Sequence, residues 1–216
     1  MILYYHPLSS YCWKVLIALY ENGTAFEPRM LEEPSVAEAW MALWPLGKFP
    51  VLRDEARDRT LGEASIIIEY LDRCAPGPFR PIPQDADAAI ETRLMDRLFD
   101  NYVMTPMQAI VADRLRPEEA RDPHGVGEAR RMLGKAYALL EERIADRRWA
   151  AGEDLTLADC AAAPALFYAD KVEPMRGGFP ILSAYLDRLA ARDSFARVLR
   201  EKEPWWPNFP FADEAG

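Results

Sequence analysis

Cysteine and histidine are scarce in this sequence of 216 residues, and each scarcity excludes a class of site. The three cysteines lie far apart, at positions 12, 74 and 160, so they form neither a disulfide framework nor a zinc-binding set. The two histidines, His6 and His124, leave no H-E-x-x-H spacing, which excludes a two-histidine metalloprotease helix. We therefore expect no bound metal.

Basic residues are outnumbered as well, with 26 lysines and arginines against 35 aspartates and glutamates and a net charge of −9. Such a chain repels polyanions, so we expect no nucleic-acid partner. No basic cluster attracts anionic lipid, and the uncharged stretch 160–169 is too short to span a bilayer. With no signal peptide and with cysteines typical of reduced thiols, we expect a cytoplasmic protein without a membrane partner.

Proline, by contrast, is concentrated in one segment and divides the chain. Four of the eight residues 76–83 are proline, which excludes a helix or a central strand and favours an extended linker. We therefore predict a first domain over 1–75, a linker over 76–84 and a second domain over 85–216. Half of the residues are apolar, enough for a substantial core.

The two sides of this linker differ in pattern. Upstream, short apolar runs alternate with helical periodicity, which predicts a small mixed sheet in the order β-α-β-α-β-β-α. The predicted elements are strands at 2–5, 26–31, 50–53 and 59–61 and helices at 11–21, 35–43 and 65–73.

Downstream, the periodicity is helical throughout and predicts an all-α bundle. A long helix over 85–115 should bend at Pro106, and further helices are expected at 127–148, 179–191 and 194–201. Thr156 and Asp159 have the spacing of a capping box at the start of another apolar helix. Trp205 and Trp206 are expected to pack back on the bundle.

The segment Ser9-Ser10-Tyr11-Cys12 follows the first strand and opens a helix. The free N–H groups and positive end of a helix favour an anion, including a thiolate. A serine hydroxyl at this position can donate a hydrogen bond to that sulfur. The simpler alternative is that Ser9 or Ser10 only caps the helix.

Two further segments have groups suited to a peptide ligand. In Gly47-Lys48-Phe49-Pro50-Val51, a cis bond before the proline would present the backbone of Val51 to a ligand. In Gly62-Glu63-Ala64-Ser65, a helix start offers N–H groups to a carboxylate and the Glu63 side chain to an ammonium group. An ordinary loop and plain capping are the respective alternatives.

Four motifs together resemble the glutathione transferase superfamily, and the resemblance covers nearly the whole chain. They are S-S-Y-C-W-K-V at 9–15, P-L-G-K-F-P-V-L at 45–52, E-A-S-I-I-I-E-Y-L-D at 63–72 and L-T-L-A-D at 155–159. The first is similar to the theta- and zeta-like serine classes. The resemblance implies a thioredoxin-like α/β N-terminal domain, an all-helical C-terminal domain and glutathione as cosubstrate.

The family's residue roles carry over to matching positions. The resemblance implies that Ser9 hydrogen-bonds the glutathione thiolate, with Ser10 and Tyr5 as alternatives and the inward-facing Cys12 last. It implies further that a glutathione-binding site includes Ser9, Ser10, Lys48, Phe49, Pro50, Val51, Glu63, Ala64 and Ser65. Ala64 stands where relatives commonly have serine, so either the Ser65 hydroxyl or the two backbone amides take over that contact.

A hydrophobic electrophile is the second substrate that the resemblance implies. We expect its pocket between the domains, lined by Leu8, Tyr11, Tyr102, Met104, Met107 and Phe167. The expected activity is conjugation of glutathione. The alternatives are a glutathione-dependent isomerase or reductive dehalogenase, or a non-enzymatic binding module on the same fold. The family habit also implies a homodimer.

Overall fold

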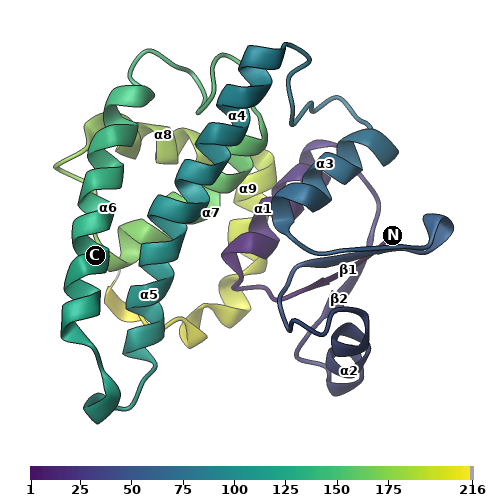
Figure 1. Ribbon diagram of the computed structural model, residues 1–216, viewed down its shortest axis with the longest axis horizontal. Helices are drawn as coiled ribbons and strands as arrows, with labels where there is room; N and C mark the ends of the chain where they lie inside the picture. Colours follow the sequence, from purple (N-terminus) through teal and green to yellow (C-terminus); the bar gives the residue numbers. More distant parts are fainter. Residues whose placement is uncertain (215–216) are drawn as a thin grey trace.

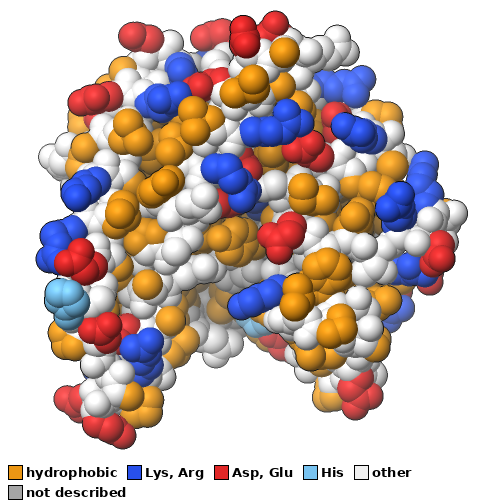
Figure 2. Space-filling view, viewed as in Figure 1, with side chains coloured by type: hydrophobic (Ala, Val, Ile, Leu, Met, Phe, Trp, Pro, Cys, Tyr) orange, Lys and Arg blue, Asp and Glu red, His pale blue; other side chains and the backbone are white. Residues whose placement is uncertain are grey.

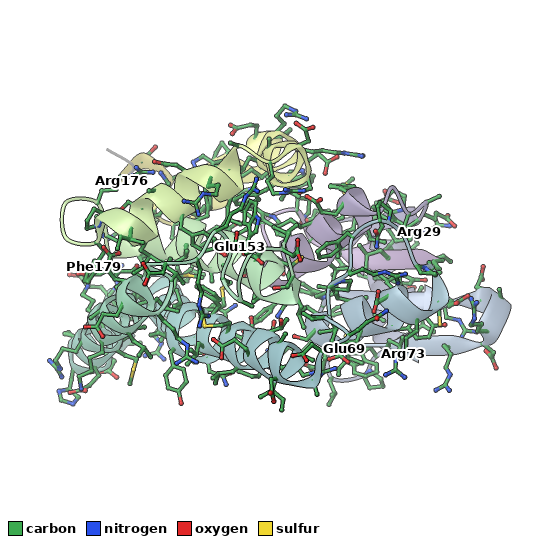
Figure 3. The ribbon with its side chains drawn as sticks, turned by 90° about the horizontal axis from the view of Figure 1, so that it is seen from above. Arg29, Glu69, Arg73, Glu153, Arg176 and Phe179 are labelled. Carbon is green, nitrogen blue, oxygen red and sulfur yellow. The ribbon has the colours of Figure 1, made fainter. Side chains whose placement is uncertain are left out.

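The structure is a computed structural model that describes residues 1–214. A sheet with its helices forms one part of the molecule, and a bundle of helices forms the other beside it (Figure 1). Seen from above, Arg29, on a strand of the first part, lies toward one end, and Arg176 and Phe179, in the second part, lie toward the other (Figure 3).

The sheet has four short strands in the order β2-β1-β3-β4. They are β1 (Ile2–Tyr5), β2 (Glu27–Met30), β3 (Val51–Asp54) and β4 (Arg59–Leu61). Strand β1 pairs in parallel with β2 and antiparallel with β3, which pairs antiparallel with β4. Because side chains alternate along a strand, Leu3 contributes to the main core while Tyr4 contributes to a smaller one on the opposite face.

Three helices complete this part: α1 (Ser10–Glu21), α2 (Pro34–Leu43) and α3 (Ala64–Cys74). Helix α1 is buried along most of its length because it packs against α3 and the helical part together. The predicted order β-α-β-α-β-β-α is confirmed, and no end of these strands and helices differs from its predicted position by more than one residue.

The second part is helical throughout, as predicted. Its helices are α4 (Ala86–Leu98), α5 (Thr105–Arg114), α6 (Pro123–Arg143), α7 (Leu157–Val172), α8 (Pro180–Ala190) and α9 (Asp193–Glu201). Between α4 and α5 lies a π-helical segment, η2 (Phe99–Met104). The single helix predicted over 85–115 is therefore divided into α4, η2 and α5, and the irregularity lies before Pro106, which occupies the first turn of α5.

The boundaries predicted for α6, 127–148, were wrong at both ends. The helix begins earlier because the Asp122 side chain accepts from the Gly125 N–H and Pro123 takes the first helical position. It ends at Arg143, and a turn closed by paired backbone bonds between Trp149 and Gly152 follows.

Helix α7 forms the centre of the bundle. Its predicted capping box is present: the Asp159 side chain accepts from the Thr156 N–H at 2.8 Å. The second Asp159 oxygen accepts from the Ala150 N–H at 2.8 Å and from the Tyr185 hydroxyl at 2.6 Å. Both oxygens of this buried carboxylate are thus hydrogen-bonded, which fixes the start of α7.

Of the two tryptophans predicted to pack back on the bundle, Trp206 does so, whereas Trp205 lies beside His6 at the end of the first strand. Trp206 contacts Phe167 and Tyr168 of α7, with ring centroids 5.6 Å and 6.2 Å apart. The buried Lys202 ammonium lies 4.1 Å from the centroid of the Trp206 ring, a cation–π contact. No helix within residues 1–214 has the length and apolar character needed to cross a membrane.

Candidate functional site

Ser9 is the N-cap of α1. Its backbone is extended, with φ −80° and ψ 117°, and its Oγ accepts a hydrogen bond from the Cys12 N–H at 3.2 Å. That bond uses a lone pair of the hydroxyl and leaves the O–H free to donate. The side chain is partly exposed, so Ser9 caps the helix and can donate to a ligand at the same time.

The other candidates for the thiolate partner lie in different surroundings. Ser10 occupies the first turn of α1 and is only 5% exposed. Tyr5 lines a cavity of about 230 Å³ together with Glu201 and Trp205, and burial, followed by the Glu201 carboxylate, raises the pKa of Tyr5. Cys12 is fully buried, and this burial raises the pKa of its thiol to about 12, so it is an uncharged core residue at neutral pH.

The loop before β3 carries the second group of predicted residues. The peptide bond between Phe49 and Pro50 is cis, and the Lys48 side chain is exposed. Val51 pairs with Tyr4 but lies one residue beyond the β3–β4 ladder, which begins at Leu52. Within the described chain, the outer edge of Val51 therefore has no strand partner.

Aromatic rings connect this loop to its surroundings. The Phe49 ring stacks on His6 with centroids 6.0 Å apart and lies 5.8 Å from Trp40. His6 directly precedes the Ser9 loop, and its ring also lies 6.3 Å from Trp205 of the C-terminal segment. The two predicted ligand loops thus contact each other through His6.

The start of α3 carries the third group. Glu63, exposed to solvent, has φ +63°, a conformation that residues other than glycine rarely adopt. A Cβ on the preceding Gly62 would lie 2.4 Å from the Trp44 ring, so the close packing of that ring requires glycine. Ala64 is buried. The turn therefore leaves the Glu63 side chain at the surface, directly before the first turn of α3.

Ser65, one of the predicted glutathione-binding residues, has a hydroxyl that is bonded to side chains of the protein itself. Its hydroxyl lies 2.8 Å from the Lys14 ammonium, 2.6 Å from the Arg97 guanidinium and 3.0 Å from an Asp96 oxygen. Asp100 completes this group, which we call the interdomain ion cluster, at 2.9 Å from Lys14. The cluster joins α1 and α3 to α4 and η2.

Sequence spacing could not reveal this cluster, because Lys14 and Asp100 lie 86 positions apart. A lysine within an apolar helical run was the only signal in the sequence. Next to the cluster, burial and then the Asp100 carboxylate raise the pKa of Tyr11 to about 12, with Glu63 a further contributor. The Tyr11 hydroxyl is therefore protonated at neutral pH and can donate a hydrogen bond.

The residues predicted to line the acceptor pocket do not lie together. Met104 and Met107 are 1% and 3% exposed and belong to the core. Tyr102 lines a separate apolar groove of about 310 Å³ with residues of α6. Phe167 packs against Trp13 and Trp206. Leu8 and Tyr11, both partly exposed, flank Ser9 in the sequence.

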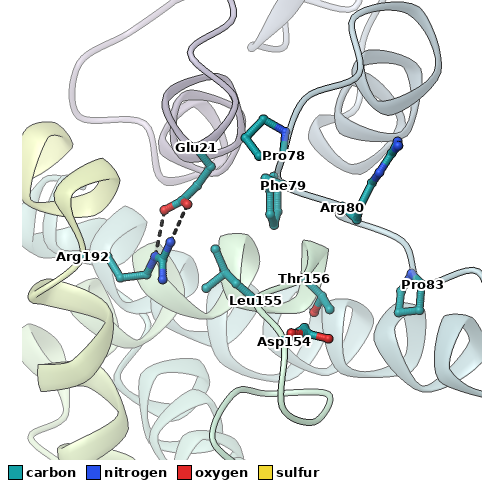
Figure 4. Close-up of a pocket in the computed structure, with 9 residues that line it drawn as sticks. All are labelled: Glu21, Pro78, Phe79, Arg80, Pro83, Asp154, Leu155, Thr156 and Arg192. Atoms are coloured by element: carbon teal, nitrogen blue, oxygen red, sulfur yellow. Dashed lines mark hydrogen bonds and ion pairs between the residues drawn. The ribbon is translucent and has the colours of Figure 1, made fainter.

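The surface of the molecule has hollows both near the predicted site residues and away from them. The space-filling view shows the molecule hollowed at its lower edge, between the helical part and α2 (Figure 2), and the start of α1 lies beside this hollow in Figure 1. A cavity of about 500 Å³ lies elsewhere, along the proline-rich linker, where Glu21 binds Arg192 at 2.8 Å and 2.5 Å (Figure 4). None of the predicted site residues lines it.

Within residues 1–214, no cluster of three or more cysteine, histidine or acidic side chains could hold a metal ion. Two family models match the chain in sequence. The model described as the N-terminal domain of glutathione S-transferase matches residues 3–79, and the one described as its C-terminal domain matches residues 100–193.

The chain belongs to the glutathione S-transferase family. A crystal structure of a glutathione S-transferase from Methylobacterium radiotolerans, in complex with glutathione sulfonate, is 30% identical. The two structures match with a TM-score of 0.79, and the match covers 91% of this chain and 93% of the Methylobacterium chain. The thioredoxin-like first part and the helical second part predicted from the sequence are therefore confirmed.

Some curated relatives of this glutathione S-transferase family member carry the family's name, such as a glutathione S-transferase of Pseudomonas putida, and others carry different names. A stringent starvation protein A homolog from Pasteurella multocida is 29% identical over 206 residues, covering 94% of this chain and 92% of the relative. The maleylacetoacetate isomerase of Rattus norvegicus is 25% identical over 201 residues, which cover 90% of this chain and 89% of the relative. Membership of the family is thus compatible with more than one activity.

Proposed function

We propose that this protein binds glutathione, holds it as a thiolate beside Ser9 and transfers it to a hydrophobic electrophile. One observation carries the proposal: the Ser9 hydroxyl caps α1 through its oxygen while its O–H remains free. The first amides of α1 and the positive helix end add to the stabilisation of a negative sulfur. A lowered thiol pKa supplies the nucleophile at neutral pH.

The remaining contacts of glutathione follow from its chemistry. Phe49 and Pro50 shape the loop that presents the Val51 backbone to the cysteinyl unit, and the exposed Lys48 ammonium faces the glycyl carboxylate.

At the γ-glutamyl end, Glu63 accepts from the ammonium group, and the Ala64 and Ser65 amides bind the carboxylate at the start of α3. Amides are favoured over the Ser65 hydroxyl because that hydroxyl is already bonded within the interdomain ion cluster.

In the chemical step, the sulfur lone pair attacks the electrophilic carbon and forms the S–C bond. In a displacement the leaving group departs with the bonding electron pair, and in an addition the product carbanion takes a proton from solvent. Positioning and electrostatic stabilisation supply the rate enhancement. Leu8 and Tyr11 lie beside Ser9 in the sequence, and we propose them as walls of the acceptor site.

Calorimetry with reduced glutathione, followed by an assay with a chlorodinitrobenzene, tests this function. We expect saturable binding at millimolar concentration or below and a rate that depends on both substrates. Ser9→Ala should lower that rate, and Ser9→Thr, which keeps both the cap and the hydroxyl, should retain most of it. Failure of the wild-type protein to bind glutathione would leave only the shared fold.

Two alternatives are favoured by the named relatives. The likeness to a maleylacetoacetate isomerase supports a glutathione-dependent isomerase, which a maleyl ester would test. A reductive dehalogenase remains a further prediction of the same class. The likeness to a stringent starvation protein, whose name states no reaction, supports a binding module without activity. Glutathione binding without turnover of any electrophile would favour that module.

We also propose that the protein is a homodimer and, with its three free thiols, cytoplasmic. Helices α3, α4 and α6 share one face of the molecule, on which apolar side chains gather (Figures 1 and 2). Exposed large apolar residues on these helices are Ile66, Ile90, Leu94, Met132 and Leu139, and Tyr102 of η2 is also exposed.

Light scattering should give twice the chain mass of 24.6 kDa. Leu94→Glu should reduce that mass, whereas Ile181→Glu, an exposed apolar position on α8, should not. A monomer at the chain mass would contradict the dimer.

A further inference from the structure

The Leu8–Ser9 peptide group is held at both of its polar ends. Its carbonyl oxygen, on Leu8, accepts a hydrogen bond from the Tyr168 hydroxyl at 2.8 Å. Its N–H, on Ser9, donates to the backbone oxygen of His6 at 3.0 Å. Because a peptide group is planar, these two bonds fix the plane from which the Ser9 Cα and side chain project.

The other hydrogen bonds of this loop are local. The Trp13 indole N–H donates to the Pro7 oxygen at 2.6 Å, and the Leu8 N–H donates to Nδ1 of His6 at 3.0 Å. The bond from Tyr168 differs from them because it comes from α7, 160 positions along the chain. It connects the helical part directly to the loop that carries the proposed thiolate partner.

Tyr168 is itself held rigidly. Its side chain is 2% exposed, and its ring lies between Trp13, at 4.7 Å, and Phe209 of the C-terminal segment, at 5.1 Å. Burial raises the pKa of Tyr168 well above its usual value, so the hydroxyl stays protonated and remains a donor. A buried donor in a packed ring cluster tolerates little movement of the carbonyl that it binds.

We propose that Tyr168 is a positioning residue for Ser9, orienting its hydroxyl toward the glutathione sulfur through the Leu8 carbonyl. The inference rests on the proposed function, since this orientation affects activity only if Ser9 donates to a thiolate. The Ser9 oxygen is already tied to the Cys12 N–H, so the direction of its O–H depends on the placement of its Cα. A hydrogen bond to a charged acceptor weakens steeply when its donor is misaligned.

Tyr168→Phe tests the proposal because it removes the hydroxyl and keeps the packed ring. Tyr137→Phe is the matched control: Tyr137 is 1% exposed, and its hydroxyl donates to the backbone oxygen of Glu173 at 3.0 Å. Its ring lies 5.4 Å from that of Phe179, at the end of the helical part remote from the sheet (Figure 3). Both variants lose one hydroxyl-to-carbonyl bond, so their losses of thermal stability should be similar.

Ultraviolet titration of bound glutathione and steady-state kinetics separate positioning from stability. We expect Tyr168→Phe to raise the pKa of the bound thiol by about 0.5 unit. At pH values below that pKa, kcat should therefore fall about threefold, while KM for glutathione should change little. Tyr137→Phe should match the wild type in both. Amide hydrogen exchange at Leu8 and Ser9 should accelerate in Tyr168→Phe alone.

Three outcomes would overturn the inference, and they are distinguishable. An unchanged thiol pKa and kcat in Tyr168→Phe, with a normal wild-type thiolate, overturns the positioning role and leaves the proposed function standing. Equal shifts in both variants assign the effect to stability. A wild-type protein that binds no thiolate overturns the proposed function and this inference with it.

Discussion

The Lys14 ammonium lies 2.9 Å from a carboxylate oxygen of Asp100, and the two side chains are 1% and 6% exposed. Lys14 belongs to α1 beside the sheet, and Asp100 belongs to η2 in the helical part. Asp96, 3% exposed, also binds Lys14, and Arg97 binds both carboxylates. The ion pair therefore joins the two parts of the molecule next to the start of α3.

Lys14→Met should destabilise the protein strongly. Removing one partner of a buried ion pair typically costs about 3–5 kcal/mol in the free energy of unfolding. Here it leaves one carboxylate charge uncompensated, because Arg97 alone must then balance both Asp96 and Asp100. Urea denaturation gives that free energy. Adding Asp100→Leu to Lys14→Met should recover part of the loss, because the double variant no longer buries the orphaned carboxylate. A single variant as stable as the wild type would show that the cluster contributes nothing.

Ser65→Ala distinguishes the two contacts that the sequence left open at the γ-glutamyl end. If backbone amides bind the carboxylate, the variant should keep its affinity for glutathione within about twofold while losing about 1 kcal/mol of stability from the ion cluster. Calorimetry measures the affinity, and denaturation measures the stability. A tenfold loss of affinity with unchanged stability would assign the contact to the Ser65 hydroxyl instead.

Tyr70→Phe should lower stability in a pH-dependent way. The Tyr70 hydroxyl donates to Asp54 at 2.7 Å, and this bond is the main cause that lowers the pKa of Asp54 from its ordinary 3.8. A lowered carboxyl pKa stabilises the folded state above the ordinary pKa, and that contribution is lost as the pH falls through the folded value.

The difference in stability between wild type and Tyr70→Phe should thus be about 1–3 kcal/mol at pH 7 and should shrink below about pH 4. Thermal melts across this range measure it. Tyr4→Phe is the control. Tyr4 is also buried, at 8% exposed, but its hydroxyl has no hydrogen-bond partner among residues 1–214. A difference that grows toward acid would contradict the assignment.

The order of the elements could be predicted from the sequence because local patterns specify it. The short apolar run at 2–5, the Thr156 capping box and the proline run all act within a few residues. The π segment η2 could not be predicted, since nothing in its sequence breaks helical periodicity before Pro106. The early start of α6 was missed although Asp122 and Pro123 are ordinary start signals.

The same distinction between local patterns and distant contacts applies to the candidate site. The N-cap position of Ser9 could be predicted because its place between a strand and a helix is visible in the sequence. The contacts that join different elements in the interdomain ion cluster, and the Tyr168 contact, were missed because their partners lie 31 to 160 positions apart. Met104 and Met107 were placed in a pocket because an apolar helical stripe has the same pattern whether it faces a core or a ligand.

Titration of the thiolate absorbance of bound glutathione tests the central claim most directly. Ser9→Ala should raise the pKa of the bound thiol by about one to two units, the effect of losing a hydrogen bond to a charged sulfur. Ser10→Ala and Tyr5→Phe should leave it near the wild-type value. An unchanged titration in Ser9→Ala, or a larger shift in either of the other two variants, would contradict the role assigned to Ser9.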